Sequence, residues 1–404
     1  MKSNYKRIGN YILDINTRNA ELNVNNLLGI NIDKFFMPSV ANIVGTDMTT
    51  YKIVKSGQFA CNTMHVGRDK RLPVALSKQE DDVIVSPAYN VFEIIDKEVL
   101  TPEYLMMWFS RKEFDRNAWF YTDADVRGGL NWKDFCNMRL PVPAVTKQKE
   151  IVKEYNVLVY RINLNNRSIE KLEETARAIF KQWFVDFEFP DENKNPYKSN
   201  GGEMKFNKEL DKEIPKGWAV KVFTEVIKLS GGGTPDTTNE SYWNGKIPFF
   251  TPADISTSYY CIETEKKVSN LGLQKSSTKL YPKNTVFVTA RGTVGAIALA
   301  GCEMTMNQSC YALSGENEFY VHQLTISAIA KLKNEAIGAV FSALVTKDFD
   351  AQFVVQPEKE VENNFQNQVK DIYNAILLKA KQNISLISLL DLLLSKLATM
   401  EDNL

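Results

Sequence analysis

The sequence predicts a mixed α/β (α+β) protein: two globular domains separated by a long antiparallel two-helix coiled coil, arranged as an internal repeat with approximate twofold symmetry. The length of 404 residues suits two to three domains of ~100–200 residues each. Two long heptad-patterned segments repeat one another, and each follows a segment that contains short β-branched runs. These observations together favour the plan globule, helix, linker, globule, helix.

The composition is that of a globular protein, with 44% hydrophobic and 24% charged residues. Lys plus Arg and Asp plus Glu number 49 each, so any contact with nucleic acid must come from local clusters of charge. Five cysteines without C-x-x-C spacing and only two histidines disfavour a zinc site and histidine-based acid–base catalysis. The N-terminal residues lack a signal-peptide core and no segment has the ~20 apolar residues of a membrane span, so we expect a cytoplasmic protein without a membrane partner.

A shift of 218 residues aligns the two long segments, placing Gln148 on Gln366, Tyr155 on Tyr373 and Asn165 on Asn383. Apolar residues recur at heptad spacing along both segments, which predicts two helices that pack on one another. The residues expected to pair the helices are Tyr155, Asn165, Leu172, Tyr373, Asn383 and Leu390.

The asparagines bear on register and orientation. Asn165 and Asn383 are the midpoints of their seams, so they would meet in either orientation and fix the register. Symmetry favours the antiparallel orientation, because repeats related by a twofold axis across the rod place their preceding domains at opposite ends. The alternative is that both asparagines face solvent, each on a helix packed against its own domain. A cross-helix contact between them distinguishes the two interpretations.

The predicted parts of the chain follow from these boundaries. They are a globular domain over 1–143, a helix over 144–189, a linker over 190–216, a second globular domain over 217–361 and a second helix over 362–404. The linker begins with a polar, turn-rich stretch up to Gly202. Within the domains we expect strands near 82–86, 91–95 and 285–289, and helices near 102–110 and 320–330.

No motif of the chain predicts catalysis. The glycine-rich run Gly231–Asp236 lacks the spacing and the lysine of a phosphate-binding loop. Asp236 with Glu265 and Lys267 matches the permissive PD…ExK nuclease pattern, but Asp236 falls in a predicted turn. No glycine-rich strand-to-helix turn for S-adenosylmethionine occurs. We therefore expect no catalytic residue, metal site or cofactor on this chain.

Basic residues cluster in both domains, six from Lys266 to Arg291 with no acid and six from Lys52 to Lys78 with Asp69 alone. Such clusters can neutralise phosphates, and neighbouring Arg, Asn and Gln side chains can contact base edges, although each cluster alone could be an ordinary solvated surface. The candidate DNA-binding residues of the first domain are Lys52, Lys55, Asn62, His65, Arg68, Lys70, Arg71, Ser86, Tyr89, Arg127 and Asn131. Those of the second domain are Thr234, Lys246, Lys275, Lys279, Arg291, Thr293, Asn307, Gln308 and Ser309.

Several runs together resemble the DNA specificity (S) subunits of type I restriction-modification systems. They are Ser230–Asp236 with Tyr242–Pro248, then Ala290–Gly295, Met306–Leu313, Ile179–Phe187, and Pro143–Gln148 leading into the first helix. The first domain departs from the Gly-Thr-Pro form and carries Val85–Phe92 instead.

The resemblance implies a non-catalytic subunit whose two target-recognition domains each bind one half of a split sequence in double-stranded DNA. It also implies two modification (methyltransferase) subunits docked on the chain, and restriction/translocase subunits; S-adenosylmethionine, ATP and magnesium would be bound by those partners. The competing hypotheses are a scaffold or inhibitor that joins methyltransferases without reading DNA, and a PD…ExK nuclease.

Overall fold

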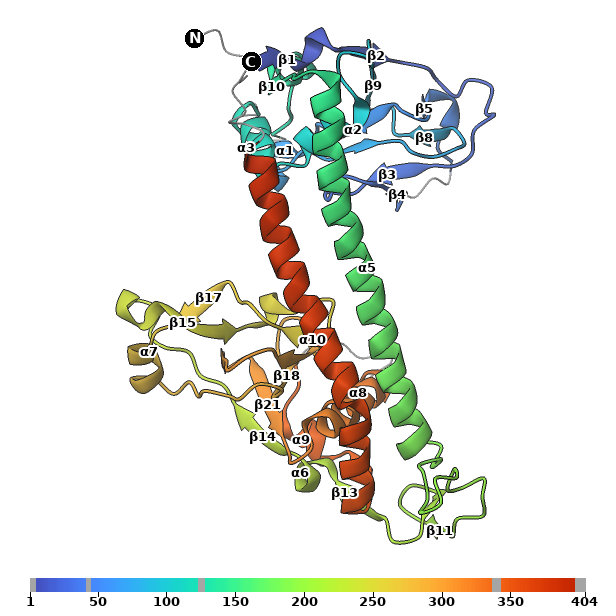
Figure 1. Ribbon diagram of the computed structural model, residues 1–404, viewed down its shortest axis with the longest axis vertical. Helices are drawn as coiled ribbons and strands as arrows, with labels where there is room; N and C mark the ends of the chain where they lie inside the picture. Colours follow the sequence, from blue (N-terminus) through green and yellow to red (C-terminus); the bar gives the residue numbers. More distant parts are fainter. Residues whose placement is uncertain (1–4, 41–44, 123–127, 336–342, 397–404) are drawn as a thin grey trace. The chain divides into compact units, whose positions relative to one another are not determined.

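The computed structural model describes residues 5–40, 45–122, 128–335 and 343–396, and the chain divides into two compact units (Figure 1). Unit 1 is Met1–Ile162 with Leu386–Leu404, and unit 2 is Asn163–Ser385. Each unit mixes helices and strands, which confirms the predicted α+β class. The two long helices, α5 (Val145–Phe184) and α10 (Lys359–Lys396), each contribute to both units.

Unit 1 is built on a four-stranded antiparallel sheet of order β2-β9-β6-β7. Its core contains Phe59 stacked on Phe92, with Phe109 from a covering helix. The strands are β1 (Tyr5–Arg7), β2 (Ile12–Ile15), β3 (Leu28–Ile30), β4 (Phe36–Pro38), β5 (Lys52–Val54), β6 (Phe59–Cys61), β7 (Val74–Leu76), β8 (Val83–Val85), β9 (Asn90–Ile94) and β10 (Arg139–Pro141). The helices besides α5 are α1 (Val66–Asp69), α2 (Pro102–Phe109), α3 (Lys112–Phe120) and α4 (Trp132–Asn137), with 3-10 turns at Ile8–Asn10 and Met48–Thr50.

Unit 2 contains a five-stranded sheet of order β14-β21-β18-β19-β16 and a three-stranded sheet of order β17-β15-β20. The strands are β11 (Met204–Asn207), β12 (Lys212–Pro215), β13 (Ala219–Val222), β14 (Lys228–Gly231), β15 (Trp243–Phe250), β16 (Tyr260–Cys261), β17 (Lys266–Val268), β18 (Val286–Thr289), β19 (Ile297–Ala300), β20 (Thr305–Met306), β21 (Cys310–Ser314) and β22 (Phe353–Gln356). The helices besides α5 and α10 are α6 (Phe223–Val226), α7 (Asn270–Gln274), α8 (Glu318–Glu335) and α9 (Thr346–Asp350), with 3-10 turns at Glu240–Tyr242 and Pro252–Asp254. The strands and helices expected near 82–95, 102–110, 285–289 and 320–330 are confirmed as β8, β9, α2, β18 and α8.

The two units share one strand plan. The order β2-β9-β6-β7 of unit 1 corresponds strand for strand to β14-β21-β18-β19 of unit 2, with antiparallel neighbours throughout. In both units a separate antiparallel pair, β1 with β10 or β13 with β22, joins the start of the domain to the strand just before the long helix. Unit 2 adds β16, which pairs in parallel with β19. The repeat seen in the helical sequences therefore extends to the sheets.

The segment expected to be a linker, 190–216, carries structure of its own. Its second half forms the antiparallel hairpin β11–β12. Phe189, directly before this segment, stacks on Tyr197 and on Trp218, with ring centroids 4.6 and 4.9 Å apart. Burial of these rings anchors the segment to the unit 2 core, which is why it folds despite its polar composition.

The long helices meet in both units. In unit 2 the buried Asn165 donates from Nδ2 to Oδ1 of Asn383 at 3.0 Å, the cross-helix contact that distinguishes a paired seam from asparagines facing solvent. In unit 1 Ile151 of α5 and Leu394 of α10 lie in the same core. The seam is not uniformly buried, because Ile387 is 48% exposed. The helices also differ from their expected ranges of 144–189 and 362–404: α5 stops at Phe184 and α10 starts at Lys359, while the end of the second range, 397–404, lies outside the described residues.

A glutamine near the start of each long helix fastens that helix to its own domain. Buried Gln148 accepts from the Thr101 backbone N–H at 2.9 Å and donates to the carbonyls of Val99 and Pro143, both at 2.8 Å. Gln366, its counterpart under the 218-residue shift, accepts from the Phe319 N–H at 3.0 Å. Both acceptors satisfy N–H groups at the start of a domain helix, α2 or α8, which have no partner within that helix.

A tyrosine one heptad further along serves the same purpose in unit 2, where α8 lies beside α10 (Figure 1). The fully buried Tyr373 hydroxyl accepts from Nε2 of Gln323 at 2.7 Å and lies 2.8 Å from Nδ1 of His322. Burial lowers the pKa of His322 to about 3, and the positive charge of Arg177 acts in the same direction. His322 is therefore a neutral core residue that helps to hold α8 against α10.

We expect His322 to make unit 2 less stable as the pH falls from about 6.5 towards 3. In that window an unfolded histidine binds a proton that the folded site does not, which lowers the free energy of unfolding by up to about 1.4 kcal/mol per pH unit. Amide exchange of α8 at pH 6.5, 5.8 and 5.0 measures this slope before most carboxylates titrate. His322→Gln should flatten it, and an equal slope in the variant and the wild type would contradict the assignment.

Candidate nucleic-acid interface

Two turns of unit 2 meet at one edge of the five-stranded sheet. Strands β18 and β21 are antiparallel with Thr289 opposite Cys310, so the turn that follows β18 lies beside the turn that precedes β21. The Ala290 N–H donates to the Ser309 carbonyl at 2.8 Å, which joins them directly. The predicted residues Arg291 and Thr293 are thereby placed next to Asn307, Gln308 and Ser309.

The Arg291 turn is shaped by its glycines. Gly292 and Gly295 have φ angles of 79° and 70°, the left-handed region that other residues rarely adopt, and their conformations reverse the chain between β18 and β19. Arg291 itself is exposed, and no hydrogen-bond or ion-pair partner for its guanidinium lies among the described residues. A guanidinium held on a stiff turn and left unpaired can form two parallel hydrogen bonds to guanine or to a phosphate.

The glycine-rich loop after β14 packs against the same edge. A side chain at Gly232 would place its Cβ 2.1 Å from the Asn307 carbonyl oxygen, and one at Gly233 would meet Oγ of Ser277 at 2.4 Å. The close approach brings Thr234 within hydrogen-bonding distance of the Gln308 side chain. Gly232 and Gly233 are thus needed for packing, whereas Gly231 has open space around it, and the predicted Thr234 joins the Arg291 group. Sequence reasoning did not identify Ser277; a run of three glycines is a signal for such close backbone contact.

Three of the predicted lysines of unit 2, Lys246, Lys275 and Lys279, are exposed and form no ion pair within the described part of the chain. Lys275 and Lys279 flank Ser277, the residue packed on Gly233. Unpaired ammonium groups next to hydrogen-bonding side chains are the combination that DNA backbone contact requires.

The equivalent edge of unit 1 gathers the predicted polar residues of the first domain. Cys61 lies opposite Asn90 in the β6–β9 ladder, so the segment from Asn62 lies beside the turn from Ser86 to Tyr89. Asn62 hydrogen-bonds the Tyr89 hydroxyl, while burial raises the pKa of that tyrosine. The Leu130 N–H donates to the Thr63 carbonyl at 2.8 Å, which places Asn131, the N-cap of α4, at the same edge.

More of the basic side chains at this edge have partners within the protein than do those of unit 2. The buried Lys52 donates to the Tyr89 carbonyl at 2.6 Å, and Arg71 pairs with Asp33 at 2.9 Å. Arg68 pairs with Asp69 at 2.7 Å, and the Lys70 ammonium lies 4.9 Å from the Trp119 ring centroid. Lys55 is exposed and His65 is half-buried at the start of α1, whereas Arg127 lies outside the described residues. Burial lowers the pKa of Lys52, and its ammonium stabilises the fold through the hydrogen bond to the Tyr89 carbonyl.

The residues of the nuclease pattern lie in different local structures: Asp236 in the loop after β14, Glu265 in a bend and Lys267 in β17. The Asp236 carboxylate accepts from the Thr238 N–H at 2.9 Å and from its hydroxyl at 2.8 Å, which lowers the pKa of Asp236. Over residues 5–40, 45–122, 128–335 and 343–396, no group of three or more His, Cys, Asp or Glu side chains could hold a metal ion. Nor is any helix in those ranges long and apolar enough to cross a membrane.

Comparison with known proteins finds similar chains and one similar fold. Residues 215–386 match a family model described as the type I restriction modification DNA specificity domain. The chain is 25% identical to the MjaIX specificity subunit of Methanocaldococcus jannaschii, over 75% of this chain and 70% of the relative. It is 23% identical to the HindI specificity subunit of Haemophilus influenzae, over 90% and 91%. A crystal structure of the type I restriction-modification S subunit from M. genitalium superposes with a TM-score of 0.55 and 13% identity, covering 97% of this chain and 95% of that one.

The fold is therefore that of a restriction-modification S subunit. The resemblance inferred from the sequence is confirmed: residues 215–386 match the family model of the type I DNA specificity domain, and most of the chain is similar to specificity subunits. Those relatives are named as specificity subunits, in agreement with the expectation of a non-catalytic chain.

Proposed function

We propose that this chain is the sequence-specific DNA-recognition subunit of a type I restriction-modification complex. Each globular domain binds one half of a bipartite target, and the paired helices set the gap between the halves. The observation that carries the proposal is the repeated strand plan, because it puts predicted DNA-binding residues at the same sheet edge in both units. The family match and the named relatives support the same class.

Within this proposal Arg291 and its neighbours Asn307 and Gln308 contact bases, while Lys246, Lys275 and Lys279 contact phosphates. The exposure and lack of internal partners of these basic side chains support the division. In the first domain Asn62, Tyr89 and Asn131 take the corresponding places. Because Lys52 is held by a backbone carbonyl, its part is to support Tyr89 rather than to neutralise a phosphate.

The helices suit the task of a spacer. We propose an antiparallel coiled coil of α5 and α10 with its register fixed by Asn165 and Asn383, which the 3.0 Å hydrogen bond supports. Four heptads of helix extend ~42 Å at 1.5 Å per residue. DNA half-sites one helical turn apart lie ~34–36 Å centre to centre, so a rod of this length could set their separation.

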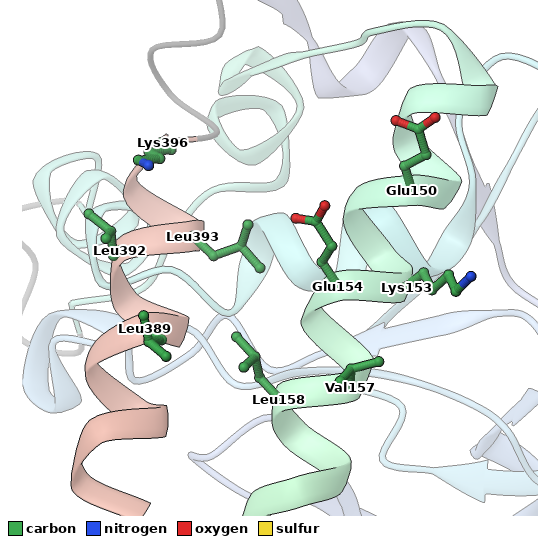
Figure 2. A pocket seen from close by; sticks show the side chains of 9 residues that line it. All are labelled: Glu150, Lys153, Glu154, Val157, Leu158, Leu389, Leu392, Leu393 and Lys396. Carbon is green, nitrogen blue, oxygen red and sulfur yellow. The ribbon is translucent and has the colours of Figure 1, made fainter.

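An apolar groove in unit 1 gives the modification subunits a place to dock. It encloses about 620 Å³ and runs between α5 and α10, where Figure 2 shows Leu158 and Leu393 on facing helices. Val157 and Leu392 on its walls are 60% and 50% exposed, and Glu150, Lys153, Glu154 and Lys396 surround them. Exposed apolar side chains ringed by charges mark protein contact surfaces. The partners, and not this chain, would bind S-adenosylmethionine, ATP and magnesium.

The alternative from another class is a scaffold or inhibitor that joins two methyltransferases without reading DNA. Protection of one split sequence over random DNA by the purified complex, at ~150 mM salt where non-specific binding is weak, separates reader from scaffold. The exposed, unpaired Arg291 favours the reader, since a scaffold has no need of it.

We expect Arg291→Ala to weaken binding to the specific target by about 1–3 kcal/mol while leaving binding to unrelated DNA little changed. The loss reflects hydrogen bonds to a base edge, and titration of labelled duplexes by fluorescence anisotropy measures it. Lys283→Ala, an exposed lysine of the same basic run, is the matched control. An equal loss on specific and unrelated DNA would reduce Arg291 to a phosphate contact.

Four residues inserted at equivalent depth in α5 and α10 should change the gap that the complex tolerates between half-sites. The insertion adds ~6 Å of helix at 1.5 Å per residue, which is close to two base steps of ~3.4 Å. Binding to a series of targets that differ only in gap length reports the preference. An unchanged optimum would refute the spacer role of the helices.

Leu392→Glu should weaken association with the modification subunit by about 10- to 100-fold, because burying a leucine contributes ~1.5–3 kcal/mol and a carboxylate cannot be buried there unpaired. Isothermal titration calorimetry with the purified partner measures the change. Leu378→Glu alters another exposed leucine of α10 outside the groove and serves as the control. Equal affinities for Leu392→Glu and wild type would remove the groove from the docking surface.

A further inference from the structure

The second recognition domain is fastened to both long helices, by different means. On the α10 side, Gln366 and Tyr373 hold the start of α8. On the α5 side, Phe180 and Phe184 pack against Tyr320 of α8. The polar contact of the domain with α5 runs through Glu173 and the loop residue Tyr259. The second attachment has no part in the recognition chemistry described above.

Glu173 and Tyr259 form a two-point contact. The Tyr259 N–H donates to Oε1 of Glu173 at 2.8 Å, and the Tyr259 hydroxyl donates to the Glu173 backbone carbonyl at 3.1 Å. Glu173 is only 7% exposed, and burial raises its pKa. A carboxylate removed from water is costly unless it is hydrogen-bonded, so this geometry is strongly preferred over a displaced loop.

Tyr259 also reaches the other helix. Its ring stacks on Tyr373 of α10 with centroids 5.8 Å apart and meets His322 of α8 edge-on at 4.5 Å. Gln323 lies 3.5 Å from its hydroxyl. One loop residue thus touches α5, α8 and α10, which makes it sensitive to any rotation of the domain about the helices.

The loop is connected to the DNA-reading edge through the sheet. Tyr259 directly precedes β16, its carbonyl accepts from the Leu299 N–H in β19, and β19 pairs with β18, the strand that ends at the Arg291 turn. Two strand pairings therefore separate the α5 contact from the guanidinium. Because neighbouring base steps lie ~3.4 Å apart, a rotation of the domain at Tyr259 changes which base step the reading edge faces.

We propose that Glu173 and Tyr259 form a positioning link that fixes the second recognition domain on the helix pair and so determines how strictly the gap length is read. The proposal rests on the proposed function and adds to it the residues that set spacing fidelity. Neither residue contacts DNA; both act through the orientation of the domain.

The test uses the full chain in complex with its modification subunits and duplexes whose half-sites are separated by the preferred gap or by one base pair more or less. Glu173→Ala should bind the preferred target within about 3-fold of wild type, but its discrimination against the altered gaps should fall by 10-fold or more. Glu173→Gln retains an oxygen that accepts from the Tyr259 N–H and should restore discrimination. Glu170→Ala, an exposed glutamate one turn away, is the matched control.

Tyr259→Phe keeps the ring and the N–H contact and removes the hydroxyl, so it gives a second reading should Glu173→Ala fail to fold. We expect an intermediate loss of discrimination. Unchanged discrimination in both variants, or an equal loss in Glu173→Gln and Glu173→Ala, would overturn the positioning link. A wild-type complex without any gap preference would instead refute the proposed function, so the two failures are distinguishable.

Discussion

The structure depends on the pairing of α5 with α10. The apolar stripes of α5 and α10 are buried against one another and against the domains, and the two stripes come from segments 218 residues apart in the chain. The polar pair Asn165–Asn383 limits how they slide, because any other register would leave a buried amide opposite an apolar side chain. The same register places Gln148 on α5 and Gln366 on α10, where each contacts its own domain.

The repeat could be predicted from the sequence alone because contacts of the same kind in both halves require the same residues at matching positions. Gln, Tyr and Asn recur at matching positions in both helices, and in the structure each glutamine binds the start of its own domain helix. The strand order β2-β9-β6-β7 and its counterpart were not predictable, since they depend on pairing between strands far apart in sequence. The hairpin within 190–216 was missed because its stability comes from Phe189 and Trp218 outside the polar run.

The candidate DNA-binding residues likewise divide into those that the sequence could identify and those whose state depends on tertiary contacts. Arg291 could be selected from sequence because flanking glycines indicate a turn, and the turn exists with its guanidinium exposed. The cluster from Lys52 to Lys78 looked equivalent by charge, yet Lys52 and Arg71 are held by Tyr89 and Asp33, residues that no local pattern connects to them. Charge counts find a basic segment; only tertiary contacts tell which cations remain available to DNA.

We propose that two similar domains on a paired-helix spacer read one split DNA sequence. Sequencing the methylated positions in the genome of cells that carry this chain with its modification and restriction partners tests that claim most directly. We expect modified bases within a single motif of two short defined halves separated by a gap of constant length. A continuous motif, a gap of variable length or methylation without a common sequence would contradict it.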